Sequence, residues 1–131
     1  MESKVYPIYG FTYNLQNPIS KMKEETDIIL IVNFPHSRYK ELPSNIWIFV
    51  KNVPHRPRLK IQRNKDERMQ IDDAFYMTIS DNPSIIGDIG SVLSTKDINY
   101  FKDFIIKNKE TLLMFWDGDL DKNNLTSRLV F

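Results

Sequence analysis

Both histidines of the chain lie in a phrase that the sequence repeats: asparagine, an apolar residue, proline and histidine. The first copy ends at His36 and the second at His55, nineteen residues later. Each copy follows an apolar run of strand length, so neighbouring strands with matched ends would bring the imidazoles together for acid/base chemistry or a shared metal. Two histidines are too few ligands for a tight transition-metal site. The simpler interpretation is a strand-end turn with an exposed imidazole, and we predict no metal and no cofactor.

Positive charge is concentrated in one stretch of a chain whose net charge is only +1. Residues 51–68 carry seven basic side chains against two acidic ones, whereas residues 69–131 carry six basic against ten acidic. Clustered lysine and arginine favour contact with phosphates, and arginine can hold a phosphate with two donors. The candidate binding residues are Lys51, Arg56, Arg58, Lys60, Arg63, Lys65 and Arg68. A solvated edge strand is the alternative, because two carboxylates interrupt the stretch and no aromatic residue is interleaved in it.

Two acidic segments are weaker candidates for a functional site. The loop from Asp117 begins like an EF-hand calcium loop, but Lys122 replaces the glycine of the sharp turn and Arg128 replaces the bidentate glutamate. We expect an acidic loop at the exit of a helix, with no second helix clearly following it. Asp72 and Asp73 are adjacent, so on a strand they would point to opposite faces and could share a role only at a bulge.

The elements that position these residues follow from hydrophobic patterning, which predicts an antiparallel meander over residues 28–80. Its strands are expected over residues 28–34, 46–50, 58–62 and 69–79. Residues 64–67 would form a hairpin tip, and the strand that follows would be broken near Asp72 and Asp73. Residues 1–25 mix aromatic residues with proline and glycine, so we expect an extension that docks on the sheet through a short strand.

A helical pattern is the clearest feature of the last third of the chain. Ser94 or Thr95 can cap the helix, and Asp97 lies three residues after Ser94, as in a capping box. Apolar residues then recur at helical spacing. They are Ile98, Phe101, Phe104, Ile105, Leu112, Leu113 and Trp116. We predict a helix over 96–116 that packs on the sheet and ends at Gly118 in a left-handed conformation.

These elements predict a single α+β domain over residues 1–131. Its antiparallel sheet would have four to five strands, with one long C-terminal helix packed on one face. The chain has no cysteine, which excludes disulfides and thiol chemistry. It has no apolar run near the ~20 residues that a membrane span needs and no signal-peptide segment, so we expect a cytoplasmic protein without membrane contact. The apolar residues 129–131 would be a docked end or a partner contact.

Several segments between residues 46 and 118 follow one another in a suggestive order. They are Ile46 to Val50, Val53-Pro54-His55, Leu59 to Ile61, Gly90-Ser91-Val92-Leu93 and Asn108-Lys109-Glu110-Thr111-Leu112-Leu113-Met114-Phe115-Trp116. In this order the chain resembles a family of small bacterial proteins of unknown function, common in mobile elements and suspected of being toxin components of toxin–antitoxin pairs. The resemblance implies a sheet with a hairpin and a helix. Where that family has its second histidine this chain has Pro57, so the resemblance supports the fold more than an activity.

The leading hypothesis is a small non-enzymatic interaction protein of mobile-element or phage type. It would bind an acidic protein surface or nucleic acid through the basic hairpin, and an inhibitor of a host defence nuclease fits this description. The alternative is a small metal-independent endoribonuclease toxin with His55 as the acid/base, where His36 could contribute only if the fold brings it close. Arg56, Arg58 or Lys60 would then stabilise phosphate charge. A third hypothesis is a homodimer built through exposed strand edges and the apolar end of the chain.

Overall fold

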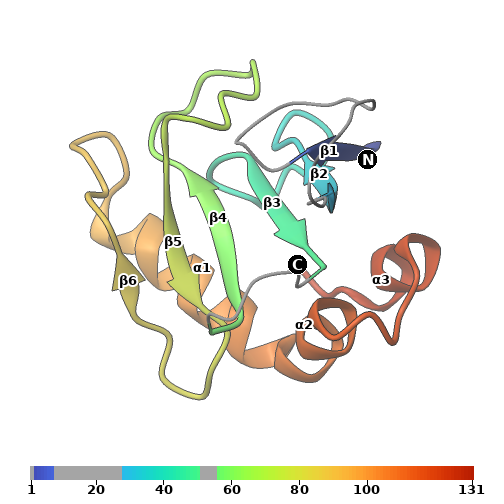
Figure 1. The fold of residues 1–131 in the computed structure, drawn as a ribbon. Helices are drawn as coiled ribbons and strands as arrows, with labels where there is room; N and C mark the ends of the chain where they lie inside the picture. Colours follow the sequence, from blue (N-terminus) through green and yellow to red (C-terminus); the bar gives the residue numbers. More distant parts are fainter. Residues whose placement is uncertain (1, 8–27, 51–55) are drawn as a thin grey trace.

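The computed structural model of the protein describes residues 2–7, 28–50 and 56–131. In these residues, helices back a six-stranded sheet (Figure 1). The strands are β1 (Glu2–Pro7), β2 (Ile28–Phe34), β3 (Ile46–Phe49), β4 (Arg58–Gln62), β5 (Ala74–Thr78) and β6 (Ile85–Ile86). The helices are α1 (Thr95–Lys107), α2 (Lys109–Trp116) and α3 (Lys122–Arg128). The predicted α+β class is confirmed.

Each strand pairs antiparallel with the next one along the chain, in the spatial order β1-β2-β3-β4-β5-β6. The predicted antiparallel sheet is therefore confirmed, and β1 to β5 match the predicted count of four to five strands. The two-residue strand β6 is a sixth strand. Hydrophobic periodicity could not predict it, because Ile85 and Ile86 are too few residues to show alternation. The expected N-terminal extension contributes β1, while residues 8–27 lie outside the described residues.

Alternate side chains of β2 to β5 form one continuous core with the helices on one face of the sheet. The strand members of this core are Val32, Phe34, Ile46, Ile48, Leu59, Ile61, Phe75 and Met77. The residues between them in sequence point to the opposite face, which lies toward the viewer in Figure 1, with α1 behind the sheet. On this second face Trp47 is also buried, whereas Lys60 and Tyr76 are half-buried.

The predicted single helix over 96–116 is wrong in its continuity: two short helices meet at Asn108. The Asn108 side chain is buried, and its Nδ2 donates to the carbonyls of Phe104 at 2.9 Å and Val130 at 2.7 Å. Its Oδ1 accepts from the Val130 backbone nitrogen at 2.8 Å. Side-chain hydrogen bonds of this kind compete with the helical ladder. The apolar stripe nevertheless remains buried on both sides of the break, at Ile98, Phe101, Phe104, Ile105, Leu112 and Trp116.

The ends of this helical segment agree with the sequence. Ser94 is the N-cap of α1, and a capping box with Asp97 is complete because Ser94 Oγ accepts from the Asp97 nitrogen while Asp97 Oδ2 accepts from the Ser94 nitrogen. Gly118 adopts a φ of +83° just after α2, as predicted for a left-handed stop. None of the helices in the described part of the chain is long and apolar enough to cross a membrane.

The tail after α2 differs from the prediction, because a third helix follows the acidic loop. Asp121 caps α3 by accepting a hydrogen bond from the Asn124 nitrogen at 2.8 Å, so this carboxylate serves as a helix cap. Beyond α3, the Phe131 ring packs between Tyr39 and Phe104, with ring centroids 5.1 and 5.4 Å away. Of the two roles predicted for residues 129–131, the structure therefore has the docked segment.

Candidate functional site

The structure divides the seven predicted binding residues by element. Lys51 lies outside the described residues. Arg56 is exposed just before β4, and Arg58 and Lys60 lie on β4 itself. The other three, Arg63, Lys65 and Arg68, lie in the connection between β4 and β5. The predicted hairpin is present, because β4 pairs antiparallel with β5, but its extent differs: residues 63–73 form a long loop that includes the predicted tip, and the return strand begins only at Ala74. This loop extends past the end of the sheet in Figure 1.

All three loop cations lie beside carboxylates of the same chain. The pairs are Arg63 Nη2 to Asp73 Oδ1 at 2.7 Å, Lys65 Nζ to Asp97 Oδ2 at 3.0 Å, and Arg68 Nη2 to Asp66 Oδ2 at 3.2 Å. The pair with Asp97 connects the loop to the first turn of α1. The predicted basic hairpin is therefore not one continuous cationic surface, because Asp73 and Asp97 from the acidic C-terminal part of the chain pair with Arg63 and Lys65. These cations serve the architecture of the loop.

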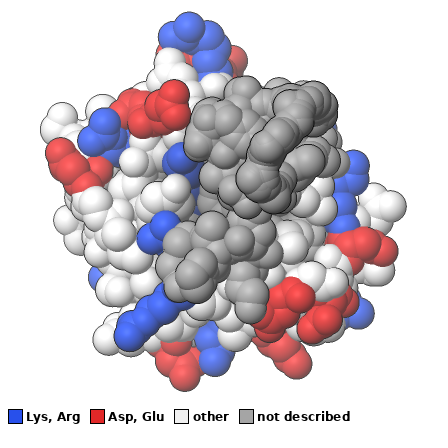
Figure 2. Space-filling model, viewed as in Figure 1, with Lys and Arg blue, Asp and Glu red and all other residues white. Residues whose placement is uncertain are grey.

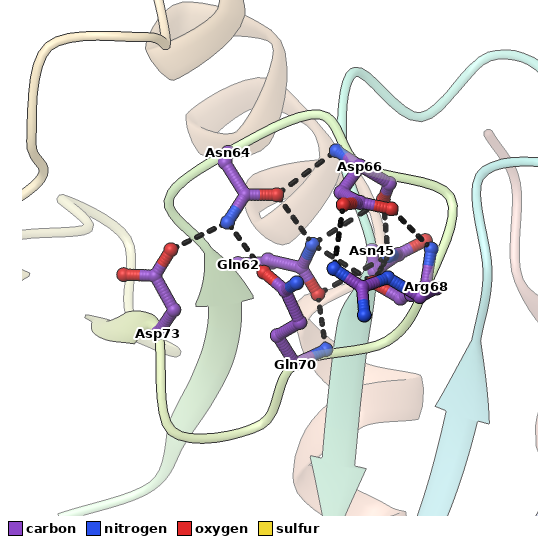
Figure 3. Close-up of polar contacts among 7 residues, drawn as sticks. All are labelled: Asn45, Gln62, Asn64, Asp66, Arg68, Gln70 and Asp73. Atoms are coloured by element: carbon purple, nitrogen blue, oxygen red, sulfur yellow. Dashed lines mark hydrogen bonds and ion pairs between the residues drawn. The ribbon is translucent and has the colours of Figure 1, made fainter.

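Two buried amides hold the loop from beneath (Figure 3). Asn45 Nδ2 donates to the backbone carbonyls of Asp66 and Arg68 at 3.1 and 3.3 Å, and Gln62 Nε2 donates to the same carbonyls at 3.3 and 3.2 Å. Gln62 Oε1 in turn accepts from the Gln70 backbone nitrogen at 2.7 Å. Both amide side chains are fully buried, so removing one would leave loop carbonyls without a partner, which is costly. The loop is a fixed part of the fold.

The loop carboxylates are stabilised in their charged form. Hydrogen bonds from the Arg63 and Asn64 side chains hold the pKa of Asp73 below its ordinary value. Partial burial acts to raise the pKa of Asp97. The backbone hydrogen bond from Ser94 and the contact with Lys65 together lower this pKa by more, so the net shift is downward. These carboxylates are suited to structural ion pairing, and their low pKa values make them poor proton donors near neutral pH.

The cations of β4 lie in a different setting, around one aromatic ring of β5. Lys60 stands opposite Tyr76 in the strand register, and Arg58 lies two residues before Lys60 on the same face. The Arg58 Cζ atom lies over the Tyr76 ring, 4.1 Å from its centroid, and Lys60 Nζ lies 5.5 Å from the same centroid. Both distances are within the range of cation–π attraction. We call Arg58, Lys60 and Tyr76 the cation–tyrosine cluster.

The electrostatics of the cluster favour binding of an anionic ligand. Burial lowers the pKa of Lys60, the Asp72 carboxylate acts in the opposite direction, and the neighbouring Arg58 lowers it again. Two cations held close together on a partly desolvated surface repel each other, and an anion placed between them would relieve this repulsion. Lysine and arginine side chains also follow the β4–β5 part of this face in Figure 2, whereas most carboxylates there lie toward the rim of the molecule.

The structure does not test whether the two histidines lie close together, because His55 lies outside the described residues. His36 follows β2, and its backbone nitrogen donates to Asn45 Oδ1 at 2.8 Å. Its Nε2 atom is buried and has no hydrogen-bond partner among the described residues. Within these same residues, no group of three or more histidine and carboxylate side chains is arranged to hold a metal ion.

Tyr76 is the residue of this site that the sequence did not bring forward. The basic stretch contains no aromatic residue, so the ring comes from the next strand, and only the β4–β5 register places it against Lys60. The available signal was alternation: Phe75 and Met77 face the core, so Tyr76 between them must face outward with the β4 cations.

The chain was also compared with models of known protein families, with curated protein sequences and with solved structures. None of these three comparisons finds a match.

Proposed function

We propose that this protein is a non-enzymatic binding protein that holds the phosphate backbone of a nucleic acid on the outer face of β4 and β5. The observation that carries the proposal is the cation–tyrosine cluster, in which Arg58 and Lys60 gather around the Tyr76 ring. Paired cations beside an aromatic ring are the combination with which many proteins bind nucleic acid, because the cations meet phosphates and the ring meets bases.

The loop supports the same assignment by contrast. Arg63, Lys65 and Arg68 each have a carboxylate within 3.2 Å, so they would have to give up an ion pair to meet a phosphate. Asp72 is the carboxylate that acts on the pKa of Lys60, and its effect on this pKa is smaller than the effect of burial. Lys60 is therefore a better candidate for contact with an anionic partner than the three loop cations. The accessory type of protein found in mobile elements or phages remains our proposal for its biological setting.

Binding of a fluorescein-labelled oligothymidylate, followed by fluorescence anisotropy at low salt, tests this proposal. The double variant Arg58→Ala and Lys60→Ala should bind about a hundredfold more weakly, since it removes two charge-assisted contacts that each contribute roughly 1.5 kcal/mol. The matched control is Lys102→Ala with Lys107→Ala, which removes the same charge from α1 on the other side of the sheet. The control should bind like the unmodified protein.

Two further results would contradict the proposal. If polyglutamate displaces the oligonucleotide at equal charge concentration, the face recognises an acidic protein surface and has no preference for nucleic acid. If the purified protein degrades RNA and His55→Ala abolishes this activity, the protein is the ribonuclease of the alternative hypothesis. We expect neither result, and we expect His55→Ala to bind the oligonucleotide as the unmodified protein does.

A further inference from the structure

The cation–tyrosine cluster also indicates which form of nucleic acid this face would hold, an inference that rests on the function proposed above. Arg58 Cζ lies over the Tyr76 ring at 4.1 Å from its centroid, so a guanidinium group covers one face of an aromatic ring, and we call this pair the Arg58–Tyr76 stack. Aromatic rings and guanidinium groups are the two side-chain types on which unpaired bases stack.

The cluster sits on the broad face of an antiparallel sheet, in the rows defined by the pairing of Arg58 with Thr78 and Lys60 with Tyr76. A sheet face cannot enter a groove of a duplex as a helix or a two-stranded ribbon does. In a duplex, moreover, the base faces are already stacked on each other, so only phosphates would reach such a surface. A single strand can turn its bases toward the sheet while its phosphates stay beside the cations.

The members of the stack are also held in place before any ligand arrives. Arg58 and Tyr76 are both half-buried. Tyr76 is paired on both sides, with Lys60 of β4 and Ile86 of β6, and Arg58 is paired with Thr78 of β5. A side chain fixed in this way loses little conformational entropy on binding. Lys60, 5.5 Å from the centroid of the same ring, is placed to meet a phosphate next to the stacked base.

We infer that the Arg58–Tyr76 stack accepts an unpaired base, so that the protein binds single-stranded nucleic acid in preference to duplex. The stack supplies base contact without hydrogen bonds to base edges, which implies tolerance of sequence. The chemical class of ligand is therefore a single strand of DNA or RNA with little sequence preference.

The test compares three labelled probes of equal phosphate number by fluorescence anisotropy. They are an oligothymidylate of about eight nucleotides, a strand with abasic sites in place of its central thymidines, and a duplex. The unmodified protein should bind the abasic strand and the duplex about fivefold more weakly than oligothymidylate, or worse, because a base stacked on a side chain contributes roughly 1 to 3 kcal/mol. Equal affinity for oligothymidylate and the abasic strand would overturn the inference and leave the proposed function standing. No binding of any probe would overturn both.

Three variants separate stacking from charge and from loss of fold. Arg58→Lys keeps the charge but loses the planar group, and Tyr76→Leu loses the ring, so each should bind oligothymidylate and the abasic strand with equal affinity. Tyr76→Phe keeps the ring and should discriminate between these strands as the unmodified protein does. If Arg58→Lys and Tyr76→Leu still prefer oligothymidylate by the same factor, the stack is not the base site.

Discussion

Lys60 on β4 stands directly opposite Tyr76 on β5, and its Nζ atom lies 5.5 Å from the centroid of the tyrosine ring. This relationship joins a residue of the basic stretch to an aromatic residue sixteen positions later in the chain. It turns a run of charges into a site with both a cationic and an aromatic component.

The first prediction concerns the alkaline range. Because burial lowers the pKa of Lys60, this residue should lose its charge at a lower pH than exposed lysines do. Binding of an oligodeoxyadenylate should therefore weaken in an alkaline step that Lys60→Arg, which keeps its charge, does not have. Identical alkaline binding profiles of Lys60→Arg and the unmodified protein would contradict this prediction.

The same shift has a consequence for stability with a definite sign. Between the depressed pKa of folded Lys60 and the ordinary lysine value, the unfolded chain binds more protons than the folded one. The contribution of Lys60 to the free energy of unfolding should therefore rise with pH in this window. Urea denaturation across the alkaline range, compared between the unmodified protein and Lys60→Met, measures this contribution as the difference in slope.

A second prediction concerns acid. The pKa of Asp73 is lowered by hydrogen bonds from Arg63 and Asn64. Its stabilising contribution is therefore complete above the ordinary pKa of aspartate, and it is lost as the pH falls from that value through the lowered pKa of the folded state. Asp73→Asn should flatten the acid dependence of the free energy of unfolding. The matched control is Asp119→Asn, an exposed carboxylate in the loop between α2 and α3. An equal effect of both variants would contradict the role of Asp73.

A third prediction concerns the loop of residues 63–73. Asn45→Ala removes the donor to the carbonyls of Asp66 and Arg68, so the loop should open more often and the protein should lose about 1 to 3 kcal/mol of stability. Limited trypsin digestion measures the opening, because Lys65 and Arg68 are exposed cleavage sites. Cleavage in the loop should be much faster in Asn45→Ala and unchanged in Asn82→Ala, an exposed amide in the β5–β6 turn. Equal rates in the two variants would count against the anchoring role.

A fourth prediction concerns the break between α1 and α2. Asn108→Ala removes the two hydrogen bonds that its side chain makes with Val130, and it should destabilise the protein by roughly 1 to 3 kcal/mol. The gain of helix propensity from alanine is smaller than this loss. Thermal unfolding measures the change, with Asn123→Ala on the exposed surface of α3 as the control. A variant as stable as the unmodified protein, with α1 and α2 fused, would contradict the role assigned to Asn108.

Local patterns in the sequence were sufficient for most of the elements. The apolar run over 28–34, the alternation over 58–62 and the capping box at Ser94 each correspond to an element in the structure. These signals are local, since hydrophobic periodicity and capping are read from residues only a few positions apart. The fold class could be predicted from them because strands followed by a helical stripe admit few arrangements.

The two main differences, the helix break and the length of the β4–β5 loop, arise from contacts between residues far apart in the chain. The helix break depends on hydrogen bonds between Asn108 and Val130, which a stripe of apolar residues cannot reveal. Likewise, the loop after Gln62 is held by Asn45 from before β3, so turn residues alone could not predict how long this loop is. The ion pair between Lys65 and Asp97 spans a similar distance in the chain. Counting charge by segment could not predict which cations would be neutralised.

Contact of Arg58 and Lys60 with phosphates is the central feature of the proposed function. The most direct measurement is the affinity for oligothymidylate as a function of salt concentration, for the unmodified protein and for Arg58→Ala with Lys60→Ala. Each phosphate contact with a single strand contributes about 0.7 to the slope of log affinity against log salt, so the double variant should lose about 1.4 from this slope. A double variant with the same slope and affinity as the unmodified protein would contradict the claim.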